Sequence, residues 1–176
     1  RHVYNPQKPK DILLAFAQRL LECGQDKLAV DTVLLACSDE PGLIPHTADM
    51  LTEHIDGPND AIFQKLETLA TNRNESGQQY QPAAGELAAV LLYRTPGPDG
   101  YARIIHIAQQ LGGQASPRTH ILAGLALWKA QQDLDAAYAY LDNAPAELYA
   151  EYQDDILAML RRTLEQPEEF AERYKT

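Results

Sequence analysis

The stretch from Lys10 to Pro41 constrains the fold most, because it holds the pattern of two complete helices joined by a short turn. Its first half has an apolar stripe at the spacing of a helix face, formed by Leu13, Phe16, Ala17 and Leu20. Gly24 is the residue type that most readily closes such a helix, and Asp26 can cap the next one. Since Pro41 ends the second helix, the stretch predicts an antiparallel helical hairpin.

Small side chains stand where the two predicted helices would meet, and they leave room for a close approach of the backbones. They are spaced by twelve and seven residues, with a proline five residues later: Ala17, Ala29, Ala36 and Pro41. This spacing resembles that of the tetratricopeptide repeat (TPR), although Leu13 and Val33 stand where that family has large aromatic residues. The resemblance implies a superhelix of stacked hairpins that serves as a scaffold for partner proteins.

Less regular copies of the pattern follow, and the clearest has Gly124, Ala136 and Tyr140 at the small, small and aromatic positions of the family. We therefore expect residues 1–176 to form one all-α domain, a right-handed α-α superhelix (TPR-like solenoid) with a C-terminal capping helix. The expected elements are about four hairpins at residues 10–41, 44–71, 83–112 and 116–144, and the capping helix at residues 146–165. An irregular helical bundle stays open as the alternative.

Three further segments and one helix face complete the expected organisation. Residues 1–9 predict an extended lead-in, residues 72–82 a polar loop or helix extension, and residues 167–176 a short helical turn. In the capping helix, the expected buried face consists of Tyr149, Tyr152, Ile156, Met159, Leu160 and Thr163. The opposite face is expected to turn charged side chains to water.

The charge balance excludes several classes of partner. The chain has 15 Lys and Arg against 25 Asp and Glu, a formal net charge of −10, so we expect neither nucleic acid nor an anionic membrane surface as partner. No apolar run approaches the roughly 18 residues that span a bilayer, which predicts no direct membrane insertion. The chain begins with Arg1 rather than Met, so a signal or anchor could precede it, and the compartment stays open between cytoplasm and periplasm.

The residues that usually carry catalysis or bind metals form no recognisable motif. Cys23 and Cys37 are expected to be small packing residues, with a bridge between them left open. His46, Asp49 and Glu53 can share a helix face, yet such sets arise often by chance, and a solvated polar face is the favoured interpretation. We therefore predict no catalytic residue, no metal and no cofactor.

Binding of another protein remains as the expected function, through the first helices of the hairpins. By resemblance to the TPR family, these helices would line a concave groove with Leu14, Gln18, Leu21, Leu87, Leu91 and Arg94. The groove is expected to bind its partner in its C-terminal half, through Arg94, Arg118, Ile121, Leu125, Trp128 and Lys129. The partner would be a peptide or an amphipathic helix, with an acidic segment favoured by the two charges of Arg118 and Lys129.

The leading functional prediction is a non-catalytic protein–protein interaction scaffold, part of a larger secretion, envelope or assembly protein. An acidic secretion chaperone of the TPR type, which would hold a translocator protein, is the first alternative. An enzyme without a readable motif is the second. Self-association of the chain is also left open.

Overall fold

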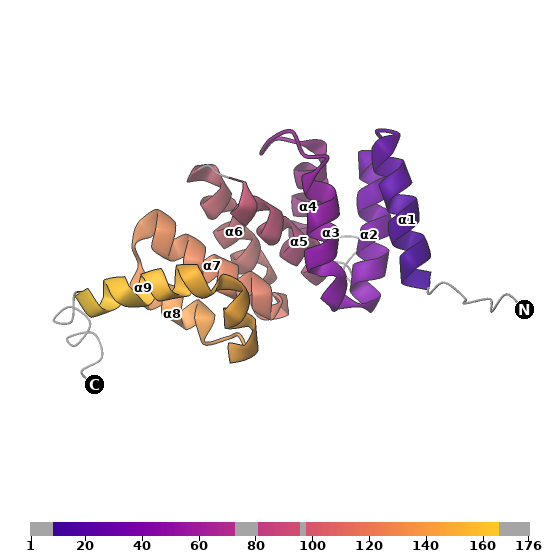
Figure 1. Ribbon diagram of the computed structural model, residues 1–176. Coiled ribbons are helices and arrows are strands. Elements are labelled where there is room, and N and C mark those ends of the chain that lie inside the picture. The colour runs from indigo at the N-terminus through magenta and orange to yellow at the C-terminus, as the bar shows by residue number, and fades with distance from the viewer. Residues whose placement is uncertain (1–8, 73–80, 96–97, 166–176) are drawn as a thin grey trace, which may run out of the picture.

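The computed structural model describes residues 9–72, 81–95 and 98–165 of the chain. Within these ranges the regular structure is entirely helical, and the all-α prediction is confirmed for them (Figure 1). No helix among them is both long enough and apolar enough to cross a membrane. Residues 1–8 of the expected lead-in, residues 73–80 of the expected polar loop and the last helical turn fall outside the described residues. Residue 9 and residues 81–82 are described, and they are helical.

The first hairpin consists of α1 (Pro9–Glu22) and α2 (Asp26–Asp39). Gly24 closes α1 with a positive φ of 73°, as expected of a glycine at a helix end. The helices meet through small residues, because Ala17, Ala29 and Ala36 are all buried. The predicted stripe is wrong in part, since α1 turns Ala17 and Leu21 to the core and leaves Phe16 55% exposed.

The second pair of helices is less regular than the expected hairpin at residues 44–71. After a short 3₁₀ turn, α3 (Ile44–Thr52) ends eight residues before the next helix, and α4 (Ala61–Thr71) begins after Asp60, whose side chain accepts a hydrogen bond from the Ile62 N–H. The main contacts of the two helices are with other elements, since α3 packs on α5 and α4 packs on α2, α5 and α6.

The third hairpin consists of α5 (Gln81–Arg94) and α6 (Pro98–Leu111), followed by the 3₁₀ turn η3 (Gly112–Gln114). Gly85 permits the close packing of the two helices. A Cβ atom added there would lie 2.4 Å from Leu111 Cδ1 and 3.2 Å from Ile107 Cγ2.

The fourth hairpin consists of α7 (Pro117–Gln131) and α8 (Leu134–Leu141). Ser116 caps α7 by accepting a hydrogen bond from the Thr119 N–H, and Asp133 caps α8 through the Ala136 N–H. At the position of the predicted small residue, Gly124, a Cβ atom would lie only 2.8 Å from the Ala137 carbonyl oxygen. The close approach of these two helices therefore depends on a missing side chain.

The predicted capping helix at residues 146–165 is in fact two elements. The chain forms the 3₁₀ segment η4 (Ala146–Tyr152) and then the α-helix α9 (Gln153–Glu165). In η4 the Tyr149 hydroxyl donates to the Leu141 carbonyl at the end of α8, which ties the tighter segment to the fourth hairpin. In α9, Met159 and Thr163 are buried, but Leu157, Leu160 and Leu164 are exposed, so the outer face is partly apolar rather than simply charged.

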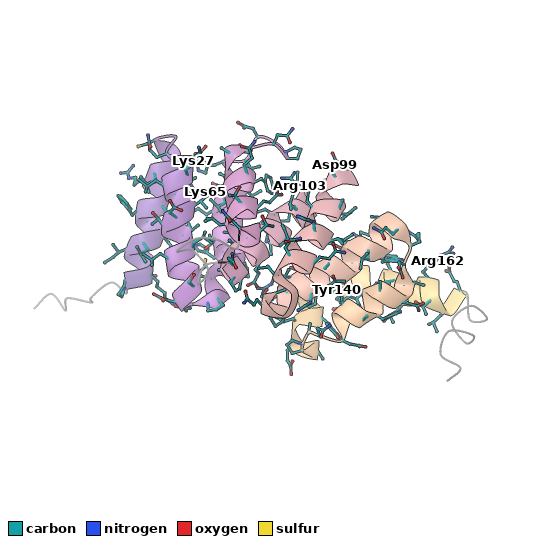
Figure 2. The ribbon with its side chains drawn as sticks, turned by 180° about the vertical axis from the view of Figure 1, so that it is seen from behind. Lys27, Lys65, Asp99, Arg103, Tyr140 and Arg162 are labelled. Carbon is teal, nitrogen blue, oxygen red and sulfur yellow. The ribbon has the colours of Figure 1, made fainter. Side chains whose placement is uncertain are left out.

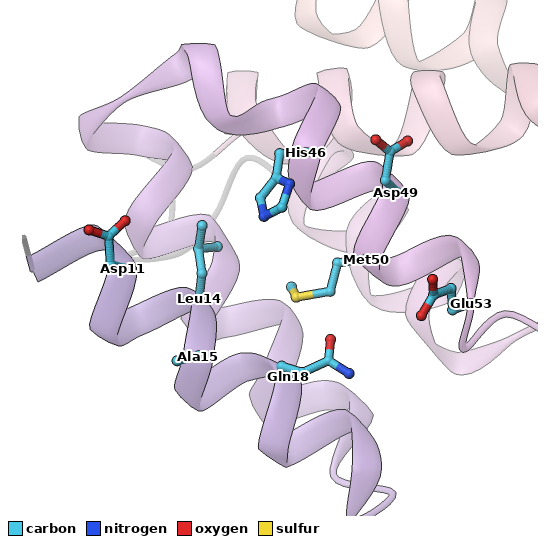
Figure 3. A pocket seen from close by; sticks show the side chains of 8 residues that line it. All are labelled: Asp11, Leu14, Ala15, Gln18, His46, Asp49, Met50 and Glu53. Atoms are coloured by element: carbon cyan, nitrogen blue, oxygen red, sulfur yellow. The ribbon is translucent and has the colours of Figure 1, made fainter. Parts of the chain in front are cut away.

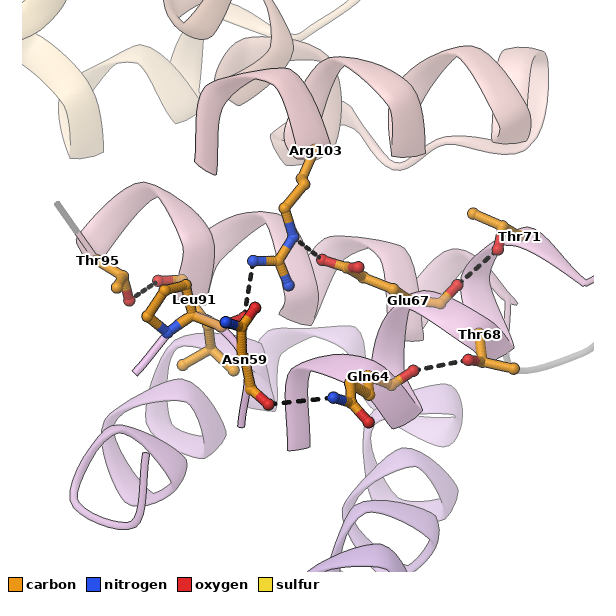
Figure 4. A network of polar contacts seen from close by, with 9 residues as sticks. Asn59, Gln64, Glu67, Thr68, Thr71, Leu91, Thr95 and Arg103 are labelled. Carbon is orange, nitrogen blue, oxygen red and sulfur yellow. Dashed lines mark hydrogen bonds and ion pairs between the residues drawn. The ribbon is translucent and has the colours of Figure 1, made fainter. Parts of the chain in front are cut away.

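The helices form two layers. In the first layer, α5 packs between α3 and α7. In the second layer, which Figure 2 shows from behind, α4 packs between α2 and α6. Ion pairs connect the second layer, because Lys65 of α4 lies 3.2 Å from Asp31 of α2. Arg103 of α6 donates to Glu67 Oε1 at 2.6 Å and to the Pro58 carbonyl at 2.7 Å (Figure 4).

Within the described ranges, the buried apolar residues form two clusters. A large cluster of buried residues runs from α1 to α7, and a small one lies between α7, α8 and α9. The small cluster consists of Ile121, Leu125, Ala137, Leu141 and Met159. Packing of the last helix thus depends on a core separate from that of the first hairpins.

Candidate functional site

A groove of about 490 Å³ separates α1 from α3, the first helices of the first two helix pairs (Figure 3). We call it the α1–α3 groove; its lining residues are Asp11, Leu14, Ala15, Gln18, His46, Asp49, Met50 and Glu53. Four come from α1 at the spacing of one helix face, and His46, Asp49 and Met50 come from α3. Leu14 and Gln18 were expected in a concave groove, and both line this one.

The groove combines an apolar floor with an acidic rim. Leu14 and Met50 are half-buried, and both pack against the large core cluster. Asp11, Asp49 and Glu53 are exposed, and in the part of the chain that the structure describes no Lys or Arg lines the groove. Arg94 of α5 reaches Asp49 from outside, with 2.7 Å between Nη1 and Oδ1. The site therefore suits an apolar group that is flanked by positive charge.

His46, Asp49 and Glu53, which the sequence places on one helix face, lie along this groove. His46 and Asp49 are on α3, and Glu53 follows the end of that helix. In the described ranges, no three His, Cys, Asp or Glu side chains come close enough together to hold a metal ion.

Arg118, expected to contact a partner, is instead at the centre of a buried ion cluster. Its side chain is 10% exposed, and Nη1 donates to Glu86 Oε1 at 2.5 Å. Nε and Nη2 donate to the two oxygens of Glu151 at 3.0 and 2.8 Å. Arg118 therefore joins α7 to α5 and η4, and both of its hydrogen-bonding edges are occupied.

The apolar members of the expected C-terminal groove are covered by the protein itself. Ile121 and Leu125 are fully buried, and they pack with Met159 of α9 in the small core cluster. Trp128 packs on the same cluster, and its Nε1 has no hydrogen-bond partner among the described residues. The expectation that these residues line an open groove is corrected, because η4 and α9 fold over this face of α7.

Lys129 and Arg94 are likewise engaged within the chain. Lys129 Nζ lies 2.9 Å from Asp155 of α9 and 4.8 Å from the centre of the Tyr93 ring. The Tyr93 hydroxyl donates to the other oxygen of Asp155 at 2.5 Å, and burial with this contact raises the pKa of Tyr93. Arg94 is the one member of the predicted set that remains exposed, at the edge of the α1–α3 groove.

A second cleft, of about 520 Å³, lies between α2, α5 and α7 beside the ion cluster. Among its lining residues are Cys37, Ser116, Glu86 and Arg118. Burial raises the pKa of the Cys37 thiol and that of the Glu86 carboxyl. A thiol with a raised pKa is a poor nucleophile, so this cleft does not favour covalent catalysis. Cys23 and Cys37 are both free thiols, the first exposed and the second buried.

Comparisons with known proteins give no relative of this chain. No family model matches it, and no match was found among curated proteins or among solved structures.

Proposed function

We propose that this chain is a TPR-like interaction scaffold that binds a basic amphipathic segment of another protein in the α1–α3 groove. The observation that carries the proposal is the composition of the groove, which has three exposed carboxylates around an apolar floor and no Lys or Arg among the described lining residues. One of the three, Asp49, is paired with Arg94 from outside the groove. The spacing of small residues in the first hairpin and the two layers of helices support a TPR-like superhelix.

The groove fits a helix or extended peptide that presents aliphatic side chains between Lys or Arg residues. Its apolar floor includes Met50, whose flexible thioether adapts to ligands of different shape. Asp11 of α1 and Glu53, which follows the end of α3, can contact charges on both sides of the bound segment. The acidic segment expected from the sequence is replaced in this proposal, because Arg118 and Lys129 are engaged within the chain.

The test uses two synthetic peptides that differ only in charge. One places leucines on one helix face with three flanking lysines, and the other has glutamates in place of the lysines. Fluorescence anisotropy should show binding of the basic peptide, weaker at higher salt, and no binding of the acidic one. In the variant Asp11→Asn/Glu53→Gln, the dissociation constant should rise about tenfold, as expected for two charge contacts of about 0.7 kcal/mol each.

A variant with the same change of net charge elsewhere serves as control. Asp99→Asn/Asp142→Asn alters two exposed carboxylates of α6 and the end of α8, away from the groove. It should bind the basic peptide as the parent does. Equal weakening in both variants, or tighter binding of the acidic peptide, would show that the groove is not the site.

A further inference from the structure

Both ends of the molecule have apolar surface that the described chain leaves uncovered. At one end, the α1–α2 face consists of Ile12 and Phe16 from α1 and Leu28 and Leu35 from α2, each between 42% and 55% exposed. At the other end, the α9 stripe consists of Leu157, Leu160 and Leu164, of which Leu164 is 76% exposed. Figure 1 shows α1 and α9 at opposite ends of the row of helices.

Each apolar surface belongs to an element at one end of the row of helices. In stacked helical repeats, each unit buries its apolar face against its neighbour, and an end unit needs a polar outer face to remain alone. The first hairpin lacks such a face, since α1 packs mainly on α2 and leaves Phe16 outside. α9 lacks one as well, because its core-facing residues, Met159 and Thr163, are on the side away from Leu157 and Leu164.

The two surfaces also match each other in spacing and charge. Leu28 and Leu35 of α2 are seven residues apart, as are Leu157 and Leu164 of α9, so each pair forms one side of its helix. Asp31 stands between the first pair and Arg161 between the second, and both are exposed. When Leu28 is set beside Leu157 with the helices parallel, the two opposite charges fall within one residue of the same level, about 1.5 Å.

From this match we infer that α9 of one molecule packs against the α1–α2 face of a second copy. The aliphatic side chains would bury one another, and Arg161 would pair with Asp31. The Asp31 side chain already lies 3.2 Å from Lys65 of its own molecule, but about half of its surface is exposed and accessible to a second copy. The contact joins two different surfaces, so it is heterologous. Each added copy leaves one free α1–α2 face and one free α9 stripe, and assembly continues beyond the dimer.

The test uses the full chain and one charged substitution at each end. Sedimentation velocity over a range of concentrations should show the parent associating into dimers and larger species. Phe16→Glu and Leu164→Glu each place a charge in one of the two surfaces, and each should be monomeric at concentrations at which the parent associates. Both side chains are mostly exposed, so the fold should survive, which circular dichroism checks.

Mixing the two variants decides between a head-to-tail contact and other modes of association. Each variant keeps one intact surface, so an equimolar mixture should form a heterodimer and nothing larger. A mixture that stays monomeric, or a parent that is monomeric at every concentration, would overturn the inference.

Two further variants examine charge. Arg161→Glu should raise the dissociation constant of self-association about tenfold or more, through loss of the attraction to Asp31 and new repulsion. Thr68→Glu adds a negative charge on an exposed position of α4, away from both ends, and should associate as the parent does. Equal association of the Arg161 variant and the parent would contradict the pairing with Asp31.

Discussion

At the scale of single residues, the closest helix contacts depend on side chains that are small or absent. Ala17 and Ala29 are fully buried between α1 and α2, and Gly124 brings α7 within van der Waals contact of the α8 backbone. A methyl group at Gly124 would meet a carbonyl oxygen, which cannot rotate away as the end of a long side chain can. These positions were identified from their spacing in the sequence.

Gly124→Ala should therefore destabilise the protein, although alanine is the better helix former. The cost of overpacking, about 1–3 kcal/mol, opposes a gain in helix propensity of about 1 kcal/mol. Urea denaturation should give a net loss of about 1 kcal/mol in the free energy of unfolding. Gly42→Ala is the matched control, because a Cβ there meets no atom within 4 Å, and it should unfold at the parent's midpoint or above.

At the scale of elements, the position of α9 depends on polar contacts as well as on Met159. Asp155 accepts hydrogen bonds from the Tyr93 hydroxyl of α5 and pairs with Lys129 of α7, so one carboxylate joins three helices. The Tyr93 ring also contacts the Tyr101 and Tyr152 rings edge-on, at centroid distances of 6.1 and 6.0 Å. The chain thus covers the face of α7 that the sequence had predicted to be open.

Tyr93→Phe should loosen this arrangement while preserving the ring contacts. Loss of the hydrogen bond should lower the free energy of unfolding by about 1 kcal/mol at neutral pH. Because the folded state raises the pKa of Tyr93, its stabilisation is complete below the ordinary tyrosine value of about 10 and is lost as the pH rises toward the folded value. The difference between variant and parent, measured by urea denaturation, should accordingly shrink at high pH.

Tyr101→Phe is the comparison for this measurement, since it alters the neighbouring ring without touching Asp155. It should have a smaller effect than Tyr93→Phe at neutral pH. A Tyr93 variant as stable as the parent would mean that the hydroxyl contributes nothing to the packing of α9.

At the scale of the whole molecule, the divided core predicts that the two ends of the chain differ in their response to mutation. The large cluster extends from α1 to α7, whereas the last helices depend on the small cluster around Met159. In a row of helices each unit contacts only its neighbours, so a defect at one end is transmitted weakly to the other.

Met159→Ala should destabilise the C-terminal end, by about 2–5 kcal/mol, because it leaves a cavity beside Ile121 and Leu125. Amide hydrogen exchange, followed by mass spectrometry, should accelerate in α8 and α9 and stay unchanged in α1 and α2. Met50→Ala, at a half-buried site in the α1–α3 groove, should leave the exchange of α8 and α9 as in the parent. Faster exchange throughout the chain in the Met159 variant would indicate a single cooperative core.

The sequence by itself determined the helical class and most helix ends, because these depend on local chemistry. Periodic apolar residues, Gly24 at the end of α1 and the caps at Ser116 and Asp133 act within a few residues along the chain. The TPR-like superhelix stays a proposal. Leu14 and Gln18 both line the α1–α3 groove because they share one face of α1, and their contact with a partner stays a prediction.

Only the tertiary structure decided which faces are open. α1 is apolar around much of its circumference, so its periodicity allowed more than one stripe, and contact of Ala17 with α2 selected the rotation that leaves Phe16 outside. Likewise, nothing local to Arg118, Ile121 and Leu125 shows that a segment more than twenty residues later folds back over them. Whether a side chain is buried depends on contacts with residues far away along the chain, and the neighbouring sequence does not specify those contacts.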